Sequence, residues 1–117
     1  MAKVTIYHNP RCSKSRQTLA ILNDEGESVD VVEYLNEPPS ASKLDSILKS
    51  LDLQPLDVIR AGEKRFKELG LSKKDDRPRK EWIKLMVENP ILIERPIVVK
   101  NKKAALGRPP ENVLDIL

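Results

Sequence analysis

Cys12 is the only cysteine of the chain and the residue best placed to carry chemistry. It follows a strand-like segment that is broken at Pro10, and it directly precedes a helix-like segment that begins at Ser13. The N–H groups and the dipole at the start of a helix favour a negative charge. An ordinary thiol, with a pKa near 8.5, is only about 3% ionised at pH 7, whereas a pKa of ~6 makes it about 90% thiolate. The position of Cys12 therefore predicts a reactive thiolate, against the alternative of a small buried hydrophobe.

The side chains near Cys12 favour the charged form of its sulfur. Those with positive charge or a hydroxyl group are Arg11, Lys14, Arg16, Ser13 and Ser15. Cations lower the pKa of a neighbouring thiol, and hydroxyl groups can donate hydrogen bonds to sulfur. His8 leads into the same turn, where it could act on Cys12 as a cation or as a hydrogen-bond donor. The alternative for His8 is a histidine at a strand end that bonds to the backbone.

Three arginines far from Cys12 in the sequence are candidates for binding an oxyanion. Arg95 precedes Pro96 at the entry to a strand, and Arg108 precedes Pro109 at the end of a hairpin. Arg60 is expected at the end of a helix in the middle of the chain. A guanidinium group matches a tetrahedral oxyanion with two parallel hydrogen bonds, and the start of a helix also accepts oxyanions. Taken singly, each arginine is typical of a surface cation. Arg95 and Arg108 are the stronger candidates, because each is held beside a rigid proline.

The elements that must position these residues begin with a β-α-β unit. Residues 3–8 and 29–34 are rich in β-branched side chains and predict strands, and the apolar pattern of residues 13–23 predicts a helix between them. Gly26 follows that helix where a terminating glycine is expected. A strand, one helix and a second strand require parallel pairing with a right-handed crossover.

The middle of the chain predicts helices. Ser40 is a candidate N-cap for a helix that runs through Leu51, and Pro55 is suited to begin another short helix. Residues 72–80 are dense in charge and predict an exposed loop, followed by a helix over residues 82–87. At the C-terminal end, residues 97–99 and 104–106 predict a hairpin, and residues 111–117 predict a last helix.

This order, β-α-β, helices, then β-β-α, predicts an α/β protein with a mixed sheet. The chain has 117 residues, which suits a single domain over residues 1–117.

The composition excludes several classes of protein. Hydrophobic residues make up 39% and charged residues 33%, as in a soluble globular protein, and no apolar run approaches the ~18–20 residues of a membrane span. One cysteine cannot form an internal disulfide, so we expect the reducing cytoplasm. The net charge of +3 suits a small anion, a phosphorylated ligand or weak nucleic-acid contact. Aromatic residues make up only 3%, which argues against stacking platforms for single-stranded nucleic acid, and we expect no nucleic-acid partner. There is no Cys/His cluster for a metal and no glycine-rich phosphate loop, and nothing points to an oligomer.

Three motifs resemble the glutaredoxin-dependent arsenate reductase family, which is related to the Spx regulators. They are IYHNPRCSKSR at residues 6–16, NPILIERPIVV at residues 89–99 and GRP at residues 107–109. They occur in the family's order and span essentially the whole chain. The resemblance implies a thioredoxin-like fold with a central helical insertion, and a cis peptide bond before Pro96.

The resemblance also implies roles for the candidate residues. Cys12 is the expected nucleophile toward arsenate, and Arg60, Arg95 and Arg108 are expected to hold the oxyanion. His8 and Ser15 are expected to support the thiolate. The implied product of the attack is a covalent thioarsenate, which glutathione and glutaredoxin reduce to arsenite. A protein with one cysteine cannot resolve its own intermediate, so external thiols are required and no bound cofactor is expected.

Two departures from the family leave other functions open. The chain ends at Leu117, where well-known members carry a further extension, and Ser13-Lys14 is bulkier than the pair that follows the cysteine in those members. One alternative is a glutathione-linked thiol-disulfide oxidoreductase without arsenate activity. The other is an Spx-like regulator, which Ser15 argues against because those sensors often carry a second cysteine at that position.

Overall fold

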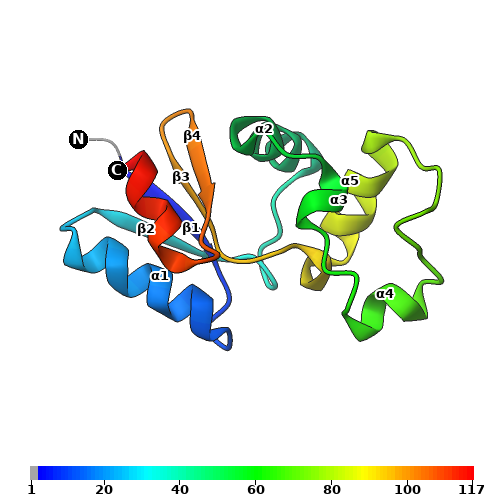
Figure 1. The fold of residues 1–117 in the computed structure, drawn as a ribbon, viewed down its shortest axis with the longest axis horizontal. Helices are drawn as coiled ribbons and strands as arrows, with labels where there is room; N and C mark the ends of the chain where they lie inside the picture. The colour runs from blue at the N-terminus through cyan, green and yellow to red at the C-terminus, as the bar shows by residue number, and fades with distance from the viewer. Residues whose placement is uncertain (1–2) are drawn as a thin grey trace. The chain divides into compact units, whose positions relative to one another are not determined.

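The computed structural model describes residues 3–117 and divides the chain into two compact units. The sheet unit comprises Met1–Glu37 and Arg95–Leu117, and the helical unit comprises Pro38–Glu94 (Figure 1). The helical unit is thus inserted between the two halves of the sheet unit, as the resemblance implies.

The sheet unit contains one four-stranded mixed sheet in the order β2-β1-β3-β4. Its strands are β1 (Val4–His8), β2 (Val29–Glu33), β3 (Ile97–Lys100) and β4 (Lys103–Leu106). β1 pairs with β2 in parallel, and β3 is antiparallel to both β1 and β4. The predicted β-α-β unit and the predicted hairpin are therefore confirmed.

Two helices lie on the same face of this sheet, α1 (Ser13–Asp24) and the 3₁₀ helix η2 (Pro110–Ile116) (Figure 1). They cover a core whose buried members are Val4, Ile6, Leu22, Val98, Ala105 and Val113. Gly26 follows α1 with a φ of 72°, a conformation that glycine adopts without steric cost. The last helix was expected to be α-helical, and its 3₁₀ form is the difference from the prediction.

The helical unit contains four α-helices and a 3₁₀ turn. They are α2 (Ala41–Leu51), α3 (Pro55–Val58), α4 (Lys64–Glu68), α5 (Arg79–Glu88) and η1 (Pro90–Leu92). Ser40 caps α2 as predicted, because its Oγ accepts a hydrogen bond from the Lys43 N–H at 3.1 Å. Leu44 and Leu48 of α2 and Met86 of α5 are fully buried, and the two helices pack against each other. The sequence did not predict α4 or η1.

The backbone around Arg60 differs from its prediction. α3 ends at Val58, and Ile59 is extended and pairs with Ile93 in an isolated antiparallel bridge. The two hydrogen bonds of this bridge run from Arg60 N–H to Leu92 O at 2.7 Å and from Glu94 N–H to Val58 O at 2.8 Å. Arg60 therefore lies in a bridged segment beyond the helix, and not at the helix end.

Over residues 3–117, no helix is long and apolar enough to cross a membrane.

Candidate active site

Cys12 lies at the junction between β1 and α1. The strand ends at His8, and the chain turns so that the Cys12 N–H donates to Asn9 O at 3.0 Å. Cys12 is the N-cap residue of α1, with extended backbone angles, and its side chain is partly exposed. The sulfur thus stands at the start of the helix, as the sequence predicted.

A buried hydrogen-bond network holds this turn. Ser15 is fully buried, and its Oγ lies 2.6 Å from His8 Nδ1 and accepts a hydrogen bond from the Asn9 N–H at 3.0 Å. The side chain of Asn9 closes the turn, because its Oδ1 accepts from the Arg11 N–H at 3.0 Å. The Ser15 hydroxyl therefore bonds to His8 and to the turn, and not to the sulfur.

The environment of His8 favours its neutral form. Burial lowers the pKa of His8, the charge of Glu33 raises it and the charge of Arg16 lowers it, with a net lowering. Of the two roles considered from the sequence, this shift favours a hydrogen-bonding role over that of a cation. The hydrogen bond to Ser15 connects His8 to a residue whose N–H bonds to the Cys12 sulfur.

The pKa of the Cys12 thiol is lowered, although burial alone would raise it. Hydrogen bonding from the N–H of Ser15, from the Arg95 side chain and from the N–H of Lys14, together with the charge of Arg95, outweighs burial. These N–H groups belong to the first turn of α1, where the start of the helix favours a negative charge on the sulfur.

Two arginines approach the sulfur from the other half of the sheet unit. Arg108 Nη2 lies 3.6 Å from Cys12 Sγ, and Arg108 Nε donates to Arg95 O at 2.8 Å. The Arg95 side chain hydrogen-bonds to the same sulfur, with its Nε and Nη1 atoms buried. The peptide bond between Arg95 and Pro96 is cis, as the resemblance implied, and so is the bond between Arg108 and Pro109, which the sequence analysis did not anticipate.

Gly107 allows the chain segments that carry Arg95 and Arg108 to approach α1. A Cβ atom at this position would lie 2.6 Å from Thr18 Oγ1 and 2.7 Å from Pro96 Cγ, closer than real contacts allow. The Gly107 N–H also donates to Pro96 O at 2.9 Å. The absence of a side chain thus lets the end of β4 pack against α1, which brings Arg108 to the sulfur.

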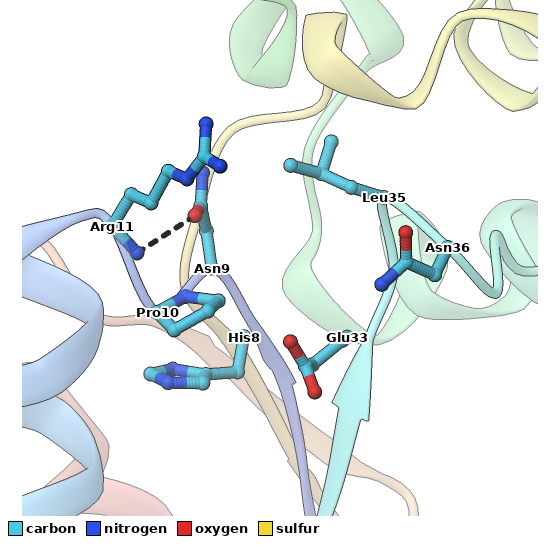
Figure 2. Close-up of a pocket in the computed structure, with 7 residues that line it drawn as sticks. All are labelled: His8, Asn9, Pro10, Arg11, Glu33, Leu35 and Asn36. Carbon is cyan, nitrogen blue, oxygen red and sulfur yellow. Dashed lines mark hydrogen bonds between the residues drawn. The ribbon is translucent and has the colours of Figure 1, made fainter.

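A cavity of about 370 Å³ opens beside the same turn, within the sheet unit. Its lining residues are His8, Asn9, Pro10, Arg11, Glu33, Leu35 and Asn36. Figure 2 shows His8 through Arg11 along one wall, and Glu33, Leu35 and Asn36, at and beyond the end of β2, along the opposite wall.

Arg60 belongs to the helical unit, where two carboxylates bind it. Its Nε lies 2.9 Å from Glu63 Oε1, and its Nη1 lies 2.6 Å from Glu94 Oε1. Burial lowers the pKa of Arg60, but Glu63 and Glu94 outweigh burial and raise it. These three residues, with Lys73, line a cavity of about 430 Å³.

The structure therefore brings five of the six predicted site residues together in one unit: Cys12, His8, Ser15, Arg95 and Arg108. The sixth, Arg60, is described within the helical unit alone. The sequence analysis missed Asn9, whose place in an Asn-Pro turn was the available signal, and the two glutamates on Arg60. Glu63 could have been found from its i,i+3 spacing. Residues 3–117 contain no group of three or more His, Cys, Asp or Glu side chains that could hold a metal ion.

Comparison with known proteins places this site in a family. The model of the ArsC family matches residues 7–116, which include the whole helical unit and most of the sheet unit. The arsenate reductase of Haemophilus influenzae is 44% identical over 115 residues, covering 97% of this chain and 98% of the relative. The arsenate reductase of Neisseria meningitidis is 41% identical over 121 residues and is covered completely, as is this chain. Curated arsenate reductases of this length therefore occur.

Solved structures agree with the fold. The structure of the arsenate reductase from Vibrio cholerae superposes with a TM-score of 0.93 at 44% identity, covering 99% of this chain and 98% of that one. The mixed four-stranded sheet with its helices is thus the thioredoxin-like α/β fold of these proteins.

Proposed function

The chain belongs to the ArsC family, and from that membership we propose that it is an arsenate reductase with Cys12 as its nucleophile. The observation that carries the proposal is the meeting of a thiol of lowered pKa with two guanidinium groups, those of Arg95 and Arg108. A thiolate supplies the nucleophile, and the guanidinium groups suit a tetrahedral oxyanion beside it. The relatives named arsenate reductase support this choice of oxyanion.

In the first step, the Cys12 sulfur attacks the arsenic atom of arsenate. A sulfur–arsenic bond forms and an arsenic–oxygen bond breaks, and the departing oxygen takes up protons and leaves as water. Arsenic is still pentavalent in the resulting thioarsenate. Arg95 and Arg108 stabilise the charge on the remaining oxygens, and the helix start favours the same charge.

His8 and Ser15 act as positioning residues in this proposal. Their hydrogen bond fixes the turn that presents the sulfur, and the N–H of Ser15 stabilises the thiolate directly. Arg60 is proposed as a third guanidinium for the oxyanion, which has to compete there with Glu63 and Glu94.

Reduction follows with thiols from outside the chain. Arsenic gains two electrons on going from arsenate to arsenite, and two thiols supply them and leave joined as one disulfide. Water then breaks the bond between the Cys12 sulfur and the trivalent arsenic, which releases arsenite and restores the Cys12 thiol. Because Cys12 is the only cysteine, we assign these thiols to glutathione and glutaredoxin, with glutathione as a co-substrate and with no resident cofactor.

The setting of the reaction completes the proposal. Residues 1–117 act as a single thioredoxin-like arsenate reductase domain that uses both units, and the ArsC match over residues 7–116 supports this. We propose a monomer in the cytoplasm, without a nucleic-acid partner. Arsenic detoxification is the corresponding physiological role.

The deciding experiment is the alkylation rate of the thiol against pH, with and without arsenate. Cys12 is the only thiol, so Cys12→Ser supplies the blank. A midpoint below the ordinary ~8.5, together with protection by arsenate but not by equal sulfate, supports the reductase. A low midpoint without protection favours the thiol-disulfide oxidoreductase. A midpoint near 8.5 without protection would make Cys12 a structural residue and overturn the proposal.

A further inference from the structure

A protein with one cysteine needs an external thiol, and that thiol has to be held beside Cys12. The cavity lined by His8 through Arg11 lies at the same turn, because Cys12 directly follows Arg11 and its N–H bonds to Asn9 O. Its volume of about 370 Å³ lies at the small end of the ~300–1,000 Å³ range of small-molecule sites. The cavity is thus placed for a co-substrate. Arsenate is instead suited to the arginines that approach the sulfur.

The charges of the cavity indicate the chemistry of its ligand. Arg11 and Glu33 stand on opposite walls, with the Arg11 guanidinium toward one end and the Glu33 carboxylate toward the other (Figure 2). Both residues are exposed, and no ion pair joins them within the part of the chain that the structure describes. Opposite charges held apart in one cavity favour a ligand that carries both an ammonium group and a carboxylate.

The other lining residues suit a peptide backbone. Asn36 offers a side-chain amide beside Glu33, and amides bond to both the N–H and the C=O of a peptide. Leu35 and Pro10 add apolar contact on the two walls. A ligand with only negative charge, such as a nucleotide, would gain from Arg11 and be repelled by Glu33.

We propose that this cavity binds the external thiol as a zwitterionic thiol peptide, with its ammonium group on Glu33 and a carboxylate on Arg11. Glutathione has this chemistry. The inference deepens the proposed function and rests on its requirement for an external thiol. It assigns to the cavity a binding role that is separate from oxyanion binding by Arg95 and Arg108.

The test is the titration of reduced glutathione into the Cys12→Ser protein by calorimetry, where no covalent step can occur. Glu33→Gln should weaken binding about tenfold, the loss expected for one charge-assisted hydrogen bond. Asp30→Asn is the matched control, because it removes an exposed carboxylate from the same strand without touching the cavity, and it should leave the affinity unchanged. Arg11→Gln should weaken binding similarly, whereas Lys103→Gln, at the start of β4, should not.

A modified ligand makes the assignment specific. N-acetyl-glutathione lacks the ammonium group, so it should bind about tenfold more weakly to the protein with Glu33 and equally weakly to Glu33→Gln. Equal losses from acetylation in both proteins would overturn the contact with Glu33. Glutathione affinity that is the same in Glu33→Gln, Arg11→Gln and both controls would overturn the cavity as the site. Neither result would touch the proposed function, which stands or falls with the protection of Cys12 by arsenate.

Discussion

The candidate oxyanion-binding arginines of the two units have different partners. In the sheet unit, Arg95 and Arg108 both approach the Cys12 sulfur, and Arg95 lowers the pKa of its thiol by a hydrogen bond and by its charge. In the helical unit, Arg60 is bound by two carboxylates that are already charged. The same residue type therefore has two settings, one in which its charge acts on a reacting atom and one in which structural partners largely neutralise it. How well a guanidinium group binds an oxyanion depends on the groups that are already hydrogen-bonded to that guanidinium.

The largest expected effect comes from removing the sulfur that the arginines of the sheet unit approach. Cys12→Ser should abolish arsenate reduction to no detectable turnover, because a serine hydroxyl does not ionise near pH 7. Serine is a good N-cap residue, so the variant should keep the start of α1. Turnover with glutathione and glutaredoxin, measured beside the unfolding midpoint, checks both statements. Retained turnover in the purified variant would contradict the role of Cys12.

Replacing the planar guanidinium while keeping its charge sharpens the comparison. Arg95→Lys should lower kcat/KM for arsenate by about 30- to 1,000-fold, equivalent to ~2–4 kcal/mol, because lysine cannot make two parallel hydrogen bonds. Arg65→Lys, on the exposed face of α4, is the matched control and should leave the rate unchanged. An Arg95→Lys rate equal to that of the control would place Arg95 outside the oxyanion site.

Removing one of the two carboxylates that bind Arg60 tests the role of the helical unit. We expect Glu94→Gln to lower the KM for arsenate about fivefold, the effect of a partly exposed ion pair worth ~1 kcal/mol. Glu68→Gln is the control, since Glu68 makes a weaker, exposed pair with Arg65 at 3.9 Å. The thiol midpoint is measured in the same variant, because Glu94 adjoins Arg95. An unchanged KM would mean that Arg60 does not bind the oxyanion.

Local patterns in the sequence were sufficient for most of the sheet unit. Segments rich in β-branched residues predicted β1 and β2, Gly26 marked the end of α1, and the single helix between β1 and β2 predicted their parallel pairing. The position of Cys12 at a helix start followed from its neighbours in the chain. Such features depend on residues a few positions apart, which is the range over which propensity and capping act.

The features that the sequence did not reveal depend on contacts between residues far apart in the sequence, or on which atom of a residue makes a hydrogen bond. Glu94 is 34 positions from Arg60, and the bridge between Ile59 and Ile93 that joins their segments involves one residue pair without periodicity. Composition also could not show that Ser15 acts on the sulfur through its N–H while its hydroxyl bonds to His8. α4 is only five residues long, too short for an apolar repeat.

The smallest expected effect is on stability, and it follows from the lowered pKa of the Cys12 thiol. Between the folded pKa and the unfolded value near 8.5, the unfolded chain binds more protons, so the free energy of unfolding rises with pH. This contribution is fully present above the unfolded pKa and is lost as the pH falls through the folded pKa. The Cys12→Ser protein lacks it, so urea unfolding from pH 5 to 9 should show a stability difference in favour of Cys12 that grows with pH and then levels off.

A difference between the two proteins that stays constant over this range would mean that the thiol has the same pKa in the folded and unfolded chains. The arginines beside the sulfur would then give the anion no net stabilisation. Arg95 supplies both a hydrogen bond and charge to the thiolate, so the pH-dependent part of the stability difference should shrink in Arg95→Gln. It should persist in Arg60→Gln if Arg60 acts on the oxyanion and not on the sulfur. The pair of variants thus separates stabilisation of the nucleophile from binding of the substrate, which turnover alone combines.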